Sequence, residues 1–156
     1  MRHITSLLFT SLFLAVYLFS NNVFADNKIN VPILAYHNFD ATKPGSMTIT
    51  TARFEEQLKW LKDNGYTVIP LRDLVDYLQG IKSSVPEKSV VITADDGRKS
   101  VYTDMWPLVR KYNVPVTLFV YPTPISNAPY AMTWEELKEL QQTGLFDIQG
   151  HTYWHP

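Results

Sequence analysis

Short apolar runs alternate with longer segments of helical periodicity along this chain, and that alternation constrains the fold more than any other feature. Five runs with the length and composition of strands occupy residues 31–36, 66–69, 89–94, 116–121 and 146–149. Apolar residues at helical spacing predict helices over residues 50–65, 71–80, 99–112 and 133–144. This order predicts parallel strands joined by right-handed helical crossovers. The sequence therefore predicts an α/β fold, and both an open doubly wound sheet and a β/α barrel satisfy the pattern.

Several helix boundaries carry a local signal. Gly65 and Gly80 stand where a glycine commonly ends a helix. Thr133 and Glu136 have the spacing of a capping box, in which each side chain binds the other residue's backbone N–H. Pro107 lies inside the third predicted helix, and we expect it to bend that helix or divide it in two.

The first 25 residues have the features of a secretory signal peptide. Arg2 precedes an apolar run over residues 7–19, and small residues lead to a predicted cleavage site after Ala25. The run is too short to span a bilayer comfortably, which disfavours the alternative of an uncleaved membrane anchor. We therefore expect a signal peptide over residues 1–25, a single domain over residues 26–156, and a secreted or periplasmic protein.

Composition excludes some classes of function. The chain has no cysteine, so disulfide and thiolate–metal frameworks are impossible. Without Arg2 it has 13 basic and 15 acidic residues, and no basic patch of the kind that binds nucleic acid is visible.

Side chains that can bind a metal or transfer a proton follow three of the predicted strands. They are His37, the adjacent pair Asp95 and Asp96, and the pair His151 and His155. Parallel strands bring their carboxyl ends to one edge of the sheet, where such folds place active sites. On a helical turn, histidines four residues apart share one face, and two histidines with one carboxylate make the three-ligand set of a catalytic zinc-type site.

The two adjacent carboxylates can have different chemical roles. Neighbouring residues that leave a strand point in different directions, so one carboxylate can bind a metal while the other acts as general base. We expect Gly97 to let the backbone turn tightly and approach the ion closely. Taken alone, Asp-Asp-Gly would be more simply a solvent-exposed turn.

Three segments carry a family resemblance. "TADDG" (residues 93–97) and "HTYWHP" (residues 151–156), with the earlier "AYH" (residues 35–37), resemble the polysaccharide deacetylase family, the NodB-homology group of carbohydrate esterase family four. The resemblance implies a distorted β/α barrel, of which only about five βα units are present. It also implies metal-dependent removal of acetyl groups from N-acetylated sugars.

Carried over by position, the resemblance assigns a role to four residues. Asp95 looks like the general base, and Asp96, His151 and His155 look like the metal ligands. Zinc is the expected divalent metal, although Co²⁺ or Ni²⁺ suits the same donors. The implied partner is an N-acetylated envelope or extracellular polysaccharide, and O-acetyl groups remain an alternative target.

The chain departs from the family pattern in two places. Ala94 stands where the family usually has an aromatic residue. The later family motifs, including the histidine that protonates the leaving amine, have no counterpart before Pro156. We therefore expect a chain truncated after the second motif, without its general acid and not competent as a deacetylase by itself.

Other aromatic and imidazole side chains are weaker candidates. His37 is either a substrate-groove residue or an ordinary loop histidine, and Tyr153 and Trp154 are candidates for stacking on a sugar ring. We interpret Tyr121 as a packing residue. Two other functions stay open: a non-catalytic glycan-binding or fragmentary relative, and, less favoured, a barrel glycosidase, which needs carboxyl groups about 5 Å or more apart across a glycosidic bond.

We predict that export removes residues 1–25, because Val23 and Ala25 provide the small side chains that precede a cleavage site. Mass spectrometry of the exported protein should find Asp26 at its amino terminus. Recovery of a chain that begins with Met1 in the membrane fraction would contradict the prediction.

Overall fold

The computed structural model describes residues 29–155, so the predicted signal peptide lies outside the described residues. Within residues 29–155, no helix has both the length and the apolar composition needed to cross a membrane.

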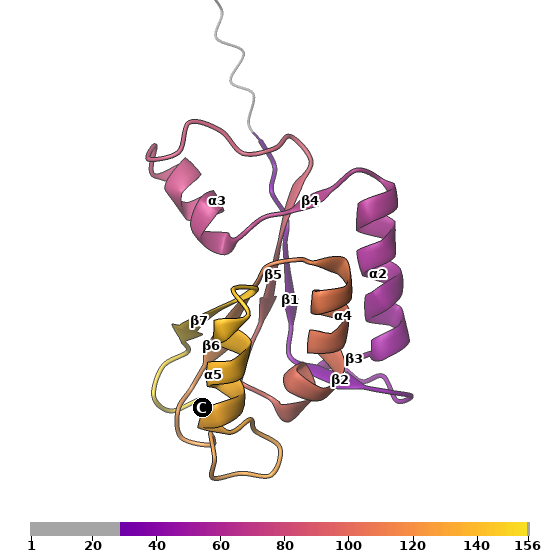
Figure 1. Cartoon of the computed structure of the whole chain (residues 1–156), viewed down its shortest axis with the longest axis vertical. Coiled ribbons are helices and arrows are strands. Elements are labelled where there is room, and N and C mark those ends of the chain that lie inside the picture. Colours follow the sequence, from indigo (N-terminus) through magenta and orange to yellow (C-terminus); the bar gives the residue numbers. More distant parts are fainter. Residues whose placement is uncertain (1–28, 156) are drawn as a thin grey trace, which may run out of the picture.

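A five-stranded parallel sheet forms the centre of the molecule (Figure 1). Its strands are β1 (Ile33–Tyr36), β4 (Thr67–Val68), β5 (Ser89–Ala94), β6 (Val116–Val120) and β7 (Phe146–Gly150). The order is β1-β5-β6-β7, with the short β4 pairing with the beginning of β5, and every ladder is parallel. The predicted α/β fold and its five strands are therefore confirmed.

The predicted helices are also present. They are α2 (Thr51–Asp63), α3 (Leu71–Leu78), α4 (Trp106–Tyr112) and α5 (Trp134–Gln142). The Thr133–Glu136 capping box is formed in both directions. The helix around Pro107 is divided as expected, into a π-helical turn, η1 (Val101–Met105), and α4, because proline lacks a backbone donor and fits best in a first helical turn.

The structure contains a second, two-stranded sheet that the sequence analysis missed. Its strands, β2 (Asn38–Asp40) and β3 (Thr48–Thr50), are parallel and have three residues each, too few to show a periodic pattern. Asn38 ties this sheet to the main fold, since its side-chain amide donates to Thr48 Oγ1 at 3.1 Å and its carbonyl accepts from Ser100 Oγ at 2.7 Å. The loop after β1 is thereby held beside the carboxyl end of β5.

The core explains why the β5 sequence is apolar without interruption. All six residues of β5 are buried. Ile92 and Ala94 contribute to a large cluster with α2, α4 and α5, whereas Val91 belongs to a separate cluster with Leu74 of α3. Figure 1 shows α2 and α4 close together and α3 set apart from them. Side chains therefore cover β5 on both faces, as a parallel sheet requires.

The turn after β5 is tight, as expected from Gly97. Asp96 and Gly97 both have left-handed backbone angles, with φ of 73° and 67°. A Cβ on Gly97 would lie 2.9 Å from Ile125 Cδ1 and 3.1 Å from Val120 Cγ1. The missing side chain therefore lets the backbone approach the apolar core. Close approach of this backbone to an ion stays a prediction.

We predict that Gly97→Ala lowers the free energy of unfolding by about 3 kcal/mol. Roughly 1 kcal/mol comes from the left-handed backbone and the rest from overpacking against Ile125 and Val120. Gly80→Ala is the matched control, because Gly80 has φ of 74° and no atom within 4 Å of the added Cβ. Urea unfolding of both variants should show a clearly larger loss for Gly97→Ala, and equal losses would refute the packing explanation.

Candidate metal centre

The five site residues predicted from the sequence lie at the carboxyl ends of three strands. His37 directly follows β1, Asp95 and Asp96 directly follow β5, His151 directly follows β7, and His155 lies four residues further along. The parallel sheet therefore collects them at one edge, as predicted.

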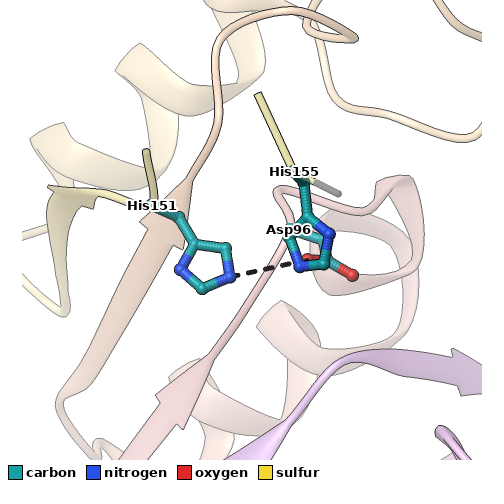
Figure 2. A group of neighbouring side chains, drawn as sticks. All are labelled: Asp96, His151 and His155. Carbon is teal, nitrogen blue, oxygen red and sulfur yellow. Dashed lines mark ion pairs between the residues drawn. The ribbon is translucent and has the colours of Figure 1, made fainter. Parts of the chain in front are cut away.

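Asp96, His151 and His155 form a compact cluster (Figure 2). Asp96 Oδ1 lies 3.5 Å from His155 Nε2 and 3.9 Å from His151 Nε2. One donor atom from each residue lies within 4.8 Å of the other two. Ligand atoms of a tetrahedral zinc site stand about 3.3 Å apart, so only a small contraction separates this cluster from a ligand set.

The environment of Asp96 fits a bound cation. Its side chain is 8% exposed, and its Oδ1 accepts no hydrogen bond from any residue that the structure describes. Burial of such an oxygen costs folding free energy, because the oxygen has lost its hydrogen bonds to water without gaining another hydrogen-bond donor. One carboxylate oxygen and two imidazole nitrogens suit zinc and similar divalent ions.

The two histidines come together without the helical turn that we expected. Residues 151–155 form an irregular bend in which Thr152 has a left-handed φ of 64°. His151 N donates to Val120 O at 2.9 Å, which continues the pairing of β7 with β6 by one residue. The bend then returns the chain, and the two imidazole ring centroids lie 5.2 Å apart.

Asp95 and Asp96 point toward different partners. Asp95 Oδ2 lies 3.6 Å from His37 Nε2, and both side chains are partly buried. A hollow of about 320 Å³ lies beside His37, between the end of β1 and the loop that leads to β3. The structure therefore places His37 against the second carboxylate and at the wall of a hollow.

The aromatic candidates lie at the rim of the site. Tyr153 and Trp154 are 63% and 70% exposed, and their rings pack edge to face with centroids 5.1 Å apart. Both side chains are accessible to a ligand.

Three further residues lie around the cluster: Arg98 and Tyr130, which were not predicted, and Tyr121, which was interpreted as a packing residue. Arg98 Nε lies 3.4 Å from Asp96 Oδ2, and the Tyr121 ring lies 5.3 Å from the ring of His155. The Tyr121 and Tyr130 hydroxyl oxygens are 3.4 Å apart, and this hydrogen bond, with burial, raises the pKa of Tyr121 to about 12. Tyr121 therefore stays neutral at physiological pH. No motif or spacing marks these residues in the sequence.

Comparison with known proteins gives a consistent result. The family model described as polysaccharide deacetylase matches residues 82–156. YxkH of Bacillus subtilis, which is named for the same family, is 36% identical over 126 residues, covering 80% of this chain and 43% of that protein. The poly-beta-1,6-N-acetyl-D-glucosamine N-deacetylase of Staphylococcus aureus is 29% identical over 110 residues, covering 68% of this chain and 37% of that protein.

Solved structures agree with the sequence comparison. The deacetylase PplD of Streptococcus pyogenes, in complex with acetate, superposes with a TM-score of 0.71 at 28% identity. The match covers 81% of this chain and 57% of PplD. The chain thus spans less than half of the two curated relatives and somewhat more than half of this structure.

We predict that Asp96→Asn weakens the affinity of the purified chain for Zn²⁺ by about 100-fold or more, because an anionic ligand is lost. Competition with a chromophoric chelator measures this affinity. Asp63→Asn is the control, since Asp63 is an exposed carboxylate at the end of α2 that pairs with Lys59. If both variants bind zinc as tightly as the unmodified chain, Asp96 is not a ligand.

Proposed function

The chain carries part of a polysaccharide deacetylase domain, and from this premise we propose that the protein hydrolyses acetyl amides on an N-acetylated envelope or extracellular polysaccharide. The observation that carries the proposal is the buried Asp96 Oδ1, which faces two imidazoles beside a second carboxylate, Asp95. In this proposal residues 1–25 are a signal peptide, and residues 26–156 are the N-terminal part of the domain of a secreted or periplasmic protein.

Asp96, His151 and His155 are the proposed ligands of a divalent ion, zinc in the first instance, with Co²⁺ or Ni²⁺ as alternatives. An ion held there would supply Lewis-acid polarisation of the acetyl carbonyl. The donor set supports this proposal, because it combines a buried carboxylate oxygen with two imidazole nitrogens, and a site with three protein ligands keeps a fourth position open.

Asp95 is the proposed general base. Its carboxylate does not face the two ligand histidines but lies near His37, so it is available to take the proton of the attacking water. Asp95 N donates to Tyr36 O at 2.9 Å, which fixes its backbone to the end of β1. The backbone of the proposed base is therefore held by β5, which it follows, and by a hydrogen bond to β1.

We assign the remaining proton transfer to His37. Among residues 29–155 it is the one imidazole outside the ligand cluster, and it lies 3.6 Å from Asp95. An imidazole can both accept and donate a proton near neutral pH, so His37 can protonate the departing amine. The expectation that the family's own general acid is absent from this chain stays a prediction.

The substrate proposal rests on the site's surroundings and on one relative. The Staphylococcus aureus relative is named for poly-beta-1,6-N-acetyl-D-glucosamine, and we propose a polymer of N-acetylated amino sugar here. The hollow beside His37 is large enough for part of a sugar ring, and the exposed rings of Tyr153 and Trp154 offer faces for stacking. Loss of an O-acetyl group by the same chemistry is the alternative reaction.

We predict that Asp95→Asn in the full-length protein lowers kcat for acetate release from β-1,6-linked N-acetylglucosamine oligomers by about 100-fold or more, while Zn²⁺ affinity stays unchanged. His37→Ala should lower kcat similarly, again without loss of Zn²⁺ affinity, because the proposed proton donor to the departing amine is removed.

Two results would contradict this assignment. Loss of zinc from Asp95→Asn would mean that both carboxylates are ligands. Tight binding of the oligomer by the zinc-loaded, unmodified protein without acetate release would favour the glycan-binding alternative.

A further inference from the structure

The two oxygens of the Asp96 carboxylate have different surroundings. Oδ1 faces His151 and His155 and accepts no hydrogen bond from the described residues. Oδ2 is held by Arg98, whose Nε lies 3.4 Å away. The guanidinium therefore occupies the oxygen that does not face the imidazoles.

Arg98 is itself held in place by its surroundings. Its guanidinium carbon lies 5.3 Å from the centre of the Tyr130 ring, within the range of a cation–π contact. The backbones are joined as well, because Arg98 forms an antiparallel bridge with Ala131, and Lys99 N donates to Tyr130 O at 2.8 Å. Side-chain and backbone contacts thus fix Tyr130 and Arg98 relative to each other.

The contacts continue from Tyr130 to another ligand candidate. The Tyr130 and Tyr121 hydroxyl oxygens are 3.4 Å apart, and the Tyr121 ring packs against His155 with centroids 5.3 Å apart. Arg98 therefore touches Asp96 directly and is connected to His155 through two tyrosines. These contacts connect the carboxyl ends of β5 and β6 with the bend after β7.

We propose that Arg98 is a positioning residue that limits Asp96 to coordination through Oδ1 alone. With Oδ2 engaged by the guanidinium, the carboxylate occupies one position on the ion, which leaves a position for the reacting groups. The inference rests on the metal site of the proposed function and adds a residue that sets its affinity and geometry.

Two effects of Arg98 oppose each other. Its positive charge repels a cation, whereas its hydrogen bond orients a buried ligand. The Arg98 side chain is 37% exposed, so solvent screens its charge, while the Asp96 side chain is 8% exposed and has no other described donor to orient it. Orientation should dominate, since loss of a group that orients a metal ligand typically costs 10–100-fold in affinity.

The test compares Arg98→Met, Arg98→Gln and the control Arg53→Met in the purified chain. Methionine keeps much of the length of arginine without a donor, and glutamine has a neutral amide that can donate to Oδ2. Arg53 lies exposed on α2 and pairs with Glu56, so its loss removes the same charge far from the cluster. Zn²⁺ affinity is measured by chelator competition, and the visible absorption of bound Co²⁺ reports coordination geometry.

We expect Arg98→Met to weaken Zn²⁺ binding by about 10-fold or more and to change the Co²⁺ spectrum. Arg98→Gln should recover most of the affinity, and Arg53→Met should match the unmodified chain. Thermal unfolding of the metal-free variants separates these effects from loss of the fold, and if Arg98→Met does not fold, the Arg98→Gln affinity and spectrum decide.

The outcomes that overturn the proposal are distinct. Equal or tighter Zn²⁺ binding by Arg98→Met, or an Arg98→Gln variant as weak as Arg98→Met, would overturn the role of Arg98 alone. Absence of Zn²⁺ binding by the unmodified chain would overturn the metal site and the proposed function with it.

Discussion

Burial of β5 on both faces is the constraint on which the rest of the structure depends. Its six residues are closed off by two separate apolar clusters, and parallel strands pair along both of its edges. A strand enclosed in this way has little freedom to shift, so the backbone position at its carboxyl end is fixed. Asp95 and Asp96 are the residues that leave this end: Asp95 directly follows the strand, and Asp96 leaves it through a left-handed backbone conformation with φ of 73°.

The two neighbouring carboxylates differ in their burial and in their charged neighbours. Asp95 is partly exposed and has an imidazole neighbour, His37. Asp96 is almost fully buried; its Oδ2 pairs with Arg98, and its Oδ1 accepts no hydrogen bond from the described residues. A buried unpaired oxygen is destabilising in an isolated fold, and a cation would convert that cost into binding affinity. In the proposed function, these different surroundings give two chemically identical neighbours different tasks.

The strands, the helices and the positions of the ligand candidates could be predicted because each leaves a signal within a short window. The apolar run of residues 89–94, the Thr133–Glu136 pair and the histidine spacing are all local patterns. β2 and β3 leave no such signal, since three residues show no period. Arg98 and Tyr130 were not predicted, and Tyr121 was interpreted only as a packing residue, because their contacts with the cluster depend on which loops the fold brings together. The contact of Gly97 with the core was not predicted for the same reason, since Ile125 is distant in sequence.

The register of β7 against β6 determines where His151 lies in the candidate metal centre. Gly150 is paired with Val120, and the next residue, His151, is bonded through its backbone to the same Val120 carbonyl. A slip of one residue in this ladder would move His151 by about 3.3 Å and turn its side chain to the opposite face of the sheet. Only one alignment of the two strands presents an imidazole to Asp96. A bound ion would therefore favour that alignment of β7 with β6 over the others, and loading of the site would be coupled to correct pairing of these two strands.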